Sequence, residues 1–367
     1  MFRQYKLKDY NFKLIVFVIA LAAIGYFAVG SAESSLQSKQ MYGIICGLFL
    51  MVVLSVIDYS NILFFHWVIY ICNILLLLAV LIWGKDVNGA KRWINIGIQF
   101  QPSELAKILL ILFFAQFIMK RREKLNSFSV LSSALVLLLI PLLLIYKEPD
   151  LSTSIVVVIS FCMMLLIGGL SYKIILTILG ITIPIGVAIF AIILKPGQKI
   201  LEGYQVNRIL AWLEPEKYAD STAYQQLNSI TAIGSGQLTG KGLNNNIIAS
   251  VKNGNFISEP QTDFIYAVIG EELGFIGAFS VIALLLLVVF ECFKIARNAK
   301  DLAGSIIAAG VASVVGFQGF MNICVATGLL PNTGIPLPFV SYGLTSLITL
   351  FGGIGIVLNI GLQAKKY

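Results

Sequence analysis

The chain has 367 residues, of which 58% are hydrophobic and only 12% are charged. This scarcity of charge excludes a soluble globular enzyme of this size, and the high hydrophobicity excludes a disordered chain. The formal net charge of +8 indicates membrane topology rather than nucleic-acid binding, because Lys and Arg gather in the cytoplasmic segments of membrane proteins.

About ten apolar segments approach the length of roughly 20 residues that a helix needs to cross a bilayer. The sequence therefore predicts an all-α polytopic membrane protein, with residues 1–367 forming one membrane domain. The predicted spans are 12–32, 41–57, 61–83, 104–119, 130–146, 151–170, 174–194, 264–293, 303–330 and 342–363.

The Lys and Arg residues of the short connecting segments lie mostly on the side of the basic N-terminal lead, which contains Arg3, Lys6 and Lys8. Since such residues accumulate on the inner side of a membrane, both termini are predicted to be cytoplasmic.

Residues 92–107 combine a short alternating segment with two charges inside a span. The alternation of apolar and polar residues over 93–101 predicts a small outer hairpin, and Arg92 beside it is a candidate ligand for a phosphate group. Glu104 and Lys107 are three residues apart in the fourth span, so they share a helix face and can form an ion pair. The pair either fixes helix packing or faces a polar cavity.

The longest connection, residues 195–263, is predicted to lie outside the membrane before the eighth span. Helical spacing of apolar residues predicts short amphipathic helices over 206–213 and 227–233, which end at Pro215 and Gly234. A loop of this length is seldom a passive connector, so the working part of the protein is expected to face outward.

The same loop contains a glycine-rich run from Gly234 to Gly242, which includes Lys241. It lacks the spacing of a Walker motif, so it is either a flexible turn or a backbone cradle for a pyrophosphate. Arg208 and Lys241 are candidate pyrophosphate ligands in the loop.

Asp263 directly precedes the eighth span. Its position alone favours an N-cap, because Asp is a preferred capping residue. The alternative is a carboxylate at a membrane-surface cleft, acting as a base or as a metal ligand.

The connection between the last two spans, Pro331 to Gly343, is uncharged and rich in Pro and Gly, and it contains Ser341. Irregular backbone at membrane depth is tolerated only where it is buried in protein or lines a cavity. The sequence contains a single histidine, His66, so no zinc site or Ser/His/Asp triad can be assembled.

Together these motifs resemble those of the shape, elongation, division and sporulation (SEDS) family, which includes RodA, FtsW and SpoVE. The resemblance covers nearly the whole chain, although Ser152 stands where members usually have Gly. The motifs that carry it are Gln101 to Lys107, Glu148 to Leu151, Gly234 to Gly242, Thr262 to Phe264, Gly270 to Gly274 and Pro331 to Gly343.

The resemblance implies a peptidoglycan glycosyltransferase that polymerises lipid II at the outer face of the plasma membrane. It implies that Asp263 is the essential carboxylate, and it adds Thr262 and Ser341 as substrate-binding candidates. It also implies a divalent cation (Mg or Mn) at Asp263, a class B penicillin-binding protein as partner, and other proteins of the elongation or division machinery.

The expected reaction is a displacement with inversion, in which Asp263 is the base or a cation ligand. Arg92, Lys107, Arg208 and Lys241 are candidates for binding the pyrophosphate, with Glu104 orienting Lys107. An elongation role is favoured, with a division or sporulation paralogue as the alternative. Two other hypotheses stay open: a lipid II flippase, and a scaffold that activates a transpeptidase.

Overall fold

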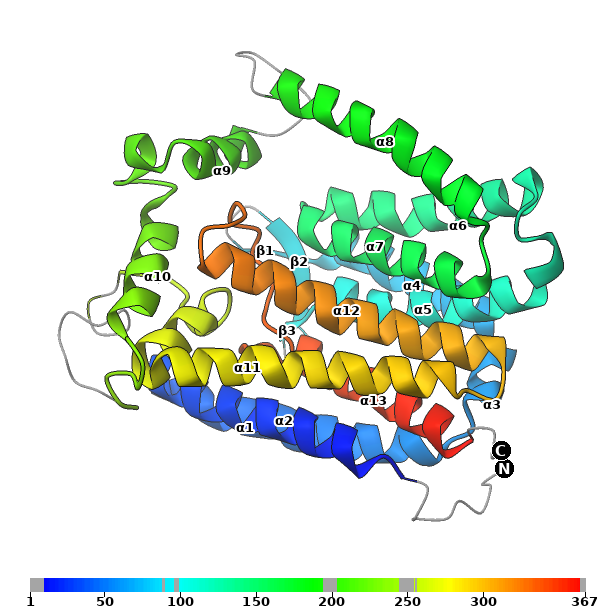
Figure 1. Cartoon of the computed structure of the whole chain (residues 1–367), viewed down its shortest axis with the longest axis horizontal. Coiled ribbons are helices and arrows are strands. Elements are labelled where there is room, and N and C mark those ends of the chain that lie inside the picture. The colour runs from blue at the N-terminus through cyan, green and yellow to red at the C-terminus, as the bar shows by residue number, and fades with distance from the viewer. Residues whose placement is uncertain are drawn as a thin grey trace.

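The computed structural model describes residues 10–87, 90–95, 99–193, 203–243, 254 and 256–363. Its elements form a helical bundle with a small sheet at one end (Figure 1). The helices are α1 (Phe12–Ala32), α2 (Ser34–Val56), α3 (Tyr59–Phe64), α4 (His66–Trp83), α5 (Pro102–Lys120), α6 (Phe128–Lys147), α7 (Leu151–Gly168), α8 (Tyr172–Ile193), α9 (Gly203–Leu213), α10 (Tyr224–Ser235), α11 (Ile265–Arg297), α12 (Leu302–Ala326) and α13 (Leu344–Leu362), with 3-10 turns η2 (Arg122–Lys124) and η3 (Pro215–Tyr218).

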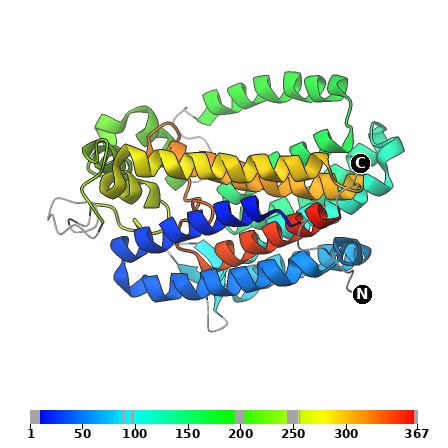
Figure 2. The same ribbon diagram turned by 60° about the horizontal axis from the view of Figure 1, so that its bottom comes forward.

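Nine of the described helices are long and apolar enough to cross a bilayer. The remaining predicted span, 174–194, corresponds to α8, which is set apart from the other helices in both views (Figures 1 and 2). The prediction of a polytopic, all-α membrane protein is therefore confirmed.

Two predicted spans differ most from the structure. The second span begins at Ser34 rather than at residue 41, because the preceding Glu33 caps the helix by accepting from the Ser35 amide. The third is divided at Phe65 into α3 and α4, and Asp58 caps α3 through the amide of Ser60. Polar caps thus set helix ends that hydropathy alone does not locate.

The centre of the bundle is formed by α5, α12 and α13, whose side chains are mostly buried. α12 packs on α5, α7 and α11, while α13 packs on α2. The α2–α13 contact depends on glycine: a methyl group at Gly355 would lie 2.6 Å from the carbonyl oxygen of Met51, so only glycine permits this approach.

The long helix α11 is interrupted at Gly274, where φ is 64° and ψ is −161°. Residues 237–242 lie along this break and bond to its free backbone groups. The amides of Lys241 and Gly242 donate to the carbonyls of Glu271 and Glu272 (3.0 and 2.9 Å), and the amide of Phe275 donates to Gln237 (2.8 Å). The glycine-rich run is therefore a packed backbone segment, and these two amides are already occupied by protein carbonyls.

Three short strands form the sheet: β1 (Lys85–Val87), β2 (Ala90–Asn95) and β3 (Gln99–Phe100), in the order β1-β2-β3 with antiparallel pairs. The hairpin predicted over 93–101 corresponds to β2 and β3. Thr345 at the start of α13 holds it in place, because its hydroxyl accepts from the Gln101 amide and donates to the Gln99 carbonyl (3.2 Å each).

The two helices expected in the long loop are α9 and α10. Pro215 follows α9 as predicted, whereas α10 continues past Gly234 to Ser235. Residues 194–202, 244–253 and 255, including much of the predicted loop, lie outside the described residues.

Candidate active site

Several connecting segments meet at the end of the bundle away from the two termini (Figure 1). They are the loop before α11, the proline-rich loop 331–343 between α12 and α13, the turn between α6 and α7, and the β-hairpin. Arg92, Thr262, Asp263 and Ser341, which were predicted to act on substrate, lie in these segments, and Arg208 lies in α9 beside them. Glu104 and Lys107 lie in α5, and Lys241 lies beside α11.

The proline-rich loop is hydrogen-bonded to the loop before α11. The hydroxyl of Ser341 donates to the carbonyl of Thr262 (2.5 Å) and accepts from the Leu337 amide (2.8 Å), and the Tyr342 amide donates to the Gln261 carbonyl (2.9 Å). Thr262 and Ser341 were predicted to bind substrate. The structure gives their side chains backbone partners instead, since the Thr262 hydroxyl donates to the Glu259 carbonyl (3.1 Å).

Asn322, a buried amide on α12, joins the same two loops. Its side-chain nitrogen donates to the carbonyls of Asp263 (2.8 Å) and Ile335 (2.7 Å). Sequence reasoning did not select this residue. The available signal was an amide in the interior of an apolar span, where side-chain hydrogen bonds hold neighbouring segments together.

Asp263 is half-buried and lies in the turn before α11. The capping interpretation is wrong, because the N-cap of α11 is Phe264 and the helix has no side-chain cap. The carboxylate faces the proline-rich loop: a methyl group built on Gly334 would lie 3.4 Å from its Oδ2 atom. The side chain is thus directed between the two loops that Asn322 holds together.

The surroundings of Asp263 raise the pKa of its carboxyl group to about 6. Burial is the main cause, since it disfavours the charged form. Arg208 and Arg92 lower the pKa, and Glu259 and Asp150 raise it. These four residues, which come from four separate segments, are therefore close enough to act on the carboxylate.

Arg92 is anchored to the turn between α6 and α7. Its Nε donates to the carbonyl of Glu148 (3.0 Å), and its Nη2 donates to that of Pro149. A guanidinium group has five N–H donors, so Arg92 can hold this turn and still contact an anion. Arg208 is anchored similarly, since its Nη1 donates to the carbonyl of Asn332 in the proline-rich loop (3.3 Å).

Glu148 is fully buried in this turn, and neither carboxylate oxygen has a hydrogen-bond partner among the described residues. Burial, and then the charge of Asp150, raise the pKa of Glu148 to about 9, against the opposing effect of Arg92. Glu148 is therefore a neutral acid at pH 7.

Asp150, which the sequence placed only within a family motif, connects the N-termini of α5 and α7. Its carboxylate caps α7 by accepting from the amide and hydroxyl of Thr153 (3.1 and 2.9 Å), and it accepts from the side-chain amide of Gln101 (3.2 Å). Next to it, the hydroxyl of Ser152 donates to the carbonyl of Thr333. The serine that departs from the usual family residue thus adds a bond to the proline-rich loop.

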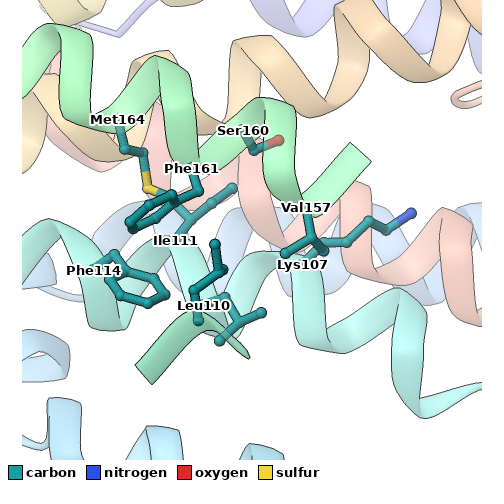
Figure 3. Close-up of a pocket in the computed structure, with 9 residues that line it drawn as sticks. Lys107, Leu110, Ile111, Phe114, Val157, Ser160, Phe161 and Met164 are labelled. Carbon is teal, nitrogen blue, oxygen red and sulfur yellow. The ribbon is translucent and has the colours of Figure 1, made fainter. Parts of the chain in front are cut away.

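Glu104 and Lys107 form a buried ion pair on α5, with Nζ 2.9 Å from each carboxylate oxygen and both residues only 3% exposed. The stem of Lys107 borders a cavity of about 10 Å³ lined mainly by apolar side chains, and its ammonium group points away from Phe114 and Met164 (Figure 3). This volume is about that of one water molecule, so the cavity cannot admit a sugar or a pyrophosphate.

Lys241 is not brought to the Asp263 site. Its Nζ lies 2.7 Å from the buried carboxylate of Glu271, beside the break in α11. Glu272, the next residue, accepts from the hydroxyl of Ser31 on α1 (2.5 Å). Glu271 and Glu272 thus bind to segments that pack beside α11.

A divalent cation would find only part of its ligands here. No group of three His, Cys, Asp or Glu side chains that could hold a metal occurs in the described ranges. The oxygen donors near Asp263 nevertheless suit a hard cation such as Mg²⁺, which is commonly held by one or two carboxylates together with substrate phosphates. Three carboxyl side chains (Asp150, Glu259, Asp263) lie near two guanidinium groups, so a substrate pyrophosphate would need added positive charge.

Comparisons with known proteins identify the family of this chain. The family model for FtsW, RodA and SpoVE, described as "Cell cycle protein", matches residues 8–366. The peptidoglycan glycosyltransferase MrdB of Escherichia coli K12 is 34% identical over 355 residues, covering 96% of this chain and 92% of that protein. The probable peptidoglycan glycosyltransferase FtsW of Geobacter metallireducens is 34% identical over 375 residues, covering 98% and 96%.

Two solved structures have a similar fold. A chain from a peptidoglycan synthase complex, described for its coordination of polymerisation and crosslinking, has a TM-score of 0.79 at 28% identity and covers 96% of this chain and 97% of its own. The rod shape determining protein RodA of Thermus thermophilus has a TM-score of 0.70 at 29% identity, with 98% of each chain covered.

Proposed function

The chain belongs to the FtsW/RodA/SpoVE family, and from this membership we propose that it is a peptidoglycan glycosyltransferase that polymerises lipid II at the outer face of a bacterial plasma membrane. One observation supports the assignment of the active site to Asp263. Asp263, with a pKa of about 6, lies near two guanidinium groups at the end of the bundle away from the termini.

The donor in this reaction is the growing glycan on undecaprenyl pyrophosphate, and the acceptor is the sugar 4-hydroxyl of an incoming lipid II. The acceptor oxygen forms a bond to the anomeric carbon of the donor, and the bond from that carbon to the pyrophosphate breaks. Asp263 takes the hydroxyl proton. A base with a pKa close to the operating pH is well suited to this transfer.

A single carboxylate base suffices here, because the leaving pyrophosphate departs as an anion and needs no proton. Glycosidases differ, since their leaving group requires a second carboxylic acid. Direct displacement then inverts the anomeric centre. Arg92 and Arg208 bind the pyrophosphate through their positive charge and further N–H donors. Their hydrogen bonds to the α6–α7 turn and to the proline-rich loop hold them in place.

A divalent cation, Mg²⁺ or Mn²⁺, is proposed at Asp263. When bound, it would neutralise the charge of the pyrophosphate. The oxygen donors and the excess of carboxylates over guanidinium groups support this assignment.

We assign no substrate contact to Lys107 or Lys241. Lys107 faces Glu104 inside the bundle, and Lys241 faces Glu271 beside the α11 break. Thr262 and Ser341 act through the backbone: they fix the loop that carries Asp263 rather than touch the lipid.

A transpeptidase of the class B penicillin-binding type is the proposed partner, together with other elongation or division proteins. The support is the similarity to a chain of a complex in which polymerisation and crosslinking are coordinated. A role in elongation is proposed, with cytoplasmic termini. The similarity to a rod shape determining protein favours elongation over division.

The test is polymerisation of purified lipid II by the reconstituted chain, with and without a chelator. The Asp263→Ala variant should be inserted and folded but make no glycan, and chelation should stop the wild-type enzyme until Mg²⁺ or Mn²⁺ is restored. Full activity of Asp263→Ala would refute the catalytic assignment. Activity insensitive to chelation would refute only the cation.

A flippase is the second candidate, because Glu104, Lys107, Glu271 and Glu272 lie within spans. In the structure these residues are engaged with one another or with neighbouring segments, as a packed bundle requires. Vesicles that make glycan from outer-leaflet lipid II but do not transfer labelled lipid II between leaflets would eliminate this alternative.

A further inference from the structure

An open groove of about 530 Å³ lies at the end of the bundle opposite Asp263. It is formed where the turn after α5 meets the turn between α11 and α12. Met119 and Arg122 line one side, while Ala299 to Leu302 and Ser305 line the other. The proposed reaction uses none of these residues.

Two cations in the groove are exposed. Neither Arg122 nor Lys300 has an ion-pair partner within the part of the chain that the structure describes. Lys294, nearby on α11, differs, since it lies 3.6 Å from the carboxylate of Glu291. The groove therefore presents two cations with which no described acidic side chain forms an ion pair.

The lining also contains one carboxylate. Asp301 is the N-cap of α12, and its Oδ1 accepts from the Gly304 amide (2.8 Å). Its Oδ2 accepts from the hydroxyl of Tyr59 on α3 (2.8 Å). Both oxygens are thus hydrogen-bonded within the protein, and the two cations of the lining exceed its one carboxylate, which leaves a net positive charge to attract an external anion.

The position of the groove indicates what the anion is attached to. α5 ends at Lys120, α11 ends at Arg297 and α12 begins at Leu302, so the groove opens where the spanning helices end. This is the depth of lipid headgroups. Half-buried Met119 and Leu302 add an apolar border, which suits a phosphate joined to a hydrocarbon chain better than a free phosphate.

We propose that this groove binds the phosphate of an anionic phospholipid in the leaflet on the side of the termini, with Arg122 and Lys300 contacting the phosphate and Met119 and Leu302 contacting the first part of the acyl chains. The site is separate from the glycosyltransferase centre, and the proposal does not depend on that function.

The test is native mass spectrometry of the full-length protein released from mixed micelles of phosphatidylglycerol and phosphatidylcholine. Wild-type protein should retain phosphatidylglycerol selectively. The Arg122→Gln/Lys300→Gln variant should bind it about 30-fold more weakly, since each basic residue near an anionic headgroup contributes about a factor of five.

The matched control is Lys13→Gln/Lys173→Gln, which removes the same charge from two exposed positions outside the groove. It should retain the selectivity of the wild type. Equal loss in the control, or no loss in the groove variant, would overturn the proposal. Displacement of the lipid by millimolar inorganic phosphate would overturn the lipid assignment in favour of a free-phosphate site.

A second measurement, thermal unfolding with added lipid, also shows whether each variant is folded. Added phosphatidylglycerol should raise the melting temperature of the wild-type and control proteins and leave that of the groove variant unchanged. A rise of equal size in all three proteins would also refute the site.

Discussion

The side-chain nitrogen of Asn322 lies 2.8 Å from the carbonyl oxygen of Asp263. Asp263 lies in the turn before α11, and Asn322 lies on α12, 59 positions further along the chain. The same nitrogen bonds to Ile335 in the proline-rich loop. A buried amide of α12 thus fixes the backbone that carries the proposed base.

Replacing Asn322 by Leu should therefore lower kcat about 100-fold, because a displacement of about 1 Å at a catalytic group costs that much. KM for lipid II should change little, since Asn322 does not touch substrate. Steady-state kinetics on purified protein test this. A variant that melts at a lower temperature yet keeps wild-type kcat would show that the residue only supports folding.

The activity should depend on pH through Asp263. A base must be deprotonated, and the pKa of this carboxyl is about 6, so activity should be full well above pH 6 and fall about tenfold per pH unit below it. The measurement is kcat/KM for glycan synthesis between about pH 4.5 and 8. An acid limb centred near pH 4 would contradict the assignment.

Glu148→Gln should preserve activity at pH 7, because Glu148 is already neutral there and the two side chains have the same shape. The pKa of Glu148 is about 9 in the folded protein, whereas it is 4.5 for an ordinary glutamate. Between these two pH values the carboxyl group ionises only in the unfolded chain, so the wild-type protein should lose stability as pH rises through this range. The variant should lack this loss. Melting temperatures measured at acidic and at alkaline pH should thus differ less in Glu148→Gln than in the wild type, and equal pH dependence would refute the buried neutral acid.

Glu104→Gln should destabilise the protein by about 3–5 kcal/mol, because it leaves the ammonium group of Lys107 buried without its partner. The double variant Glu104→Gln/Lys107→Met should recover much of this stability. Its activity decides between the two interpretations of the pair. Restored glycan synthesis would identify a packing role, and a stable but inactive double variant would return Lys107 to the list of substrate ligands.

Lys241→Met should lower the melting temperature, because it removes the ion pair with the buried carboxylate of Glu271. Since Lys241 is partly exposed, the expected cost is about 1–3 kcal/mol. Lys241→Met/Glu271→Gln is the matched control and should melt closer to the wild type. KM for lipid II should be unaffected in both, whereas a large rise in KM confined to the loss of Lys241 would restore its proposed contact with pyrophosphate.

The spans could be predicted from the sequence because each is an apolar run of the required length, and the ion pair of Glu104 and Lys107 followed from helical spacing. The position of Lys241 could not be predicted from the sequence. Its partner Glu271 lies thirty positions along the chain, and their pairing depends on a helix break that hydropathy does not reveal. Asn322 was missed for a similar reason, since both of its partners are backbone carbonyls in loops without regular periodicity.

The break at Gly274 ties residues 237–242 to α11. These residues satisfy backbone groups of α11 that would otherwise lack partners, and each unsatisfied group in hydrocarbon costs several kcal/mol. Opening this contact in each catalytic cycle would break several backbone hydrogen bonds at once. We therefore expect segment 237–242 to stay in place while substrate binds and product leaves.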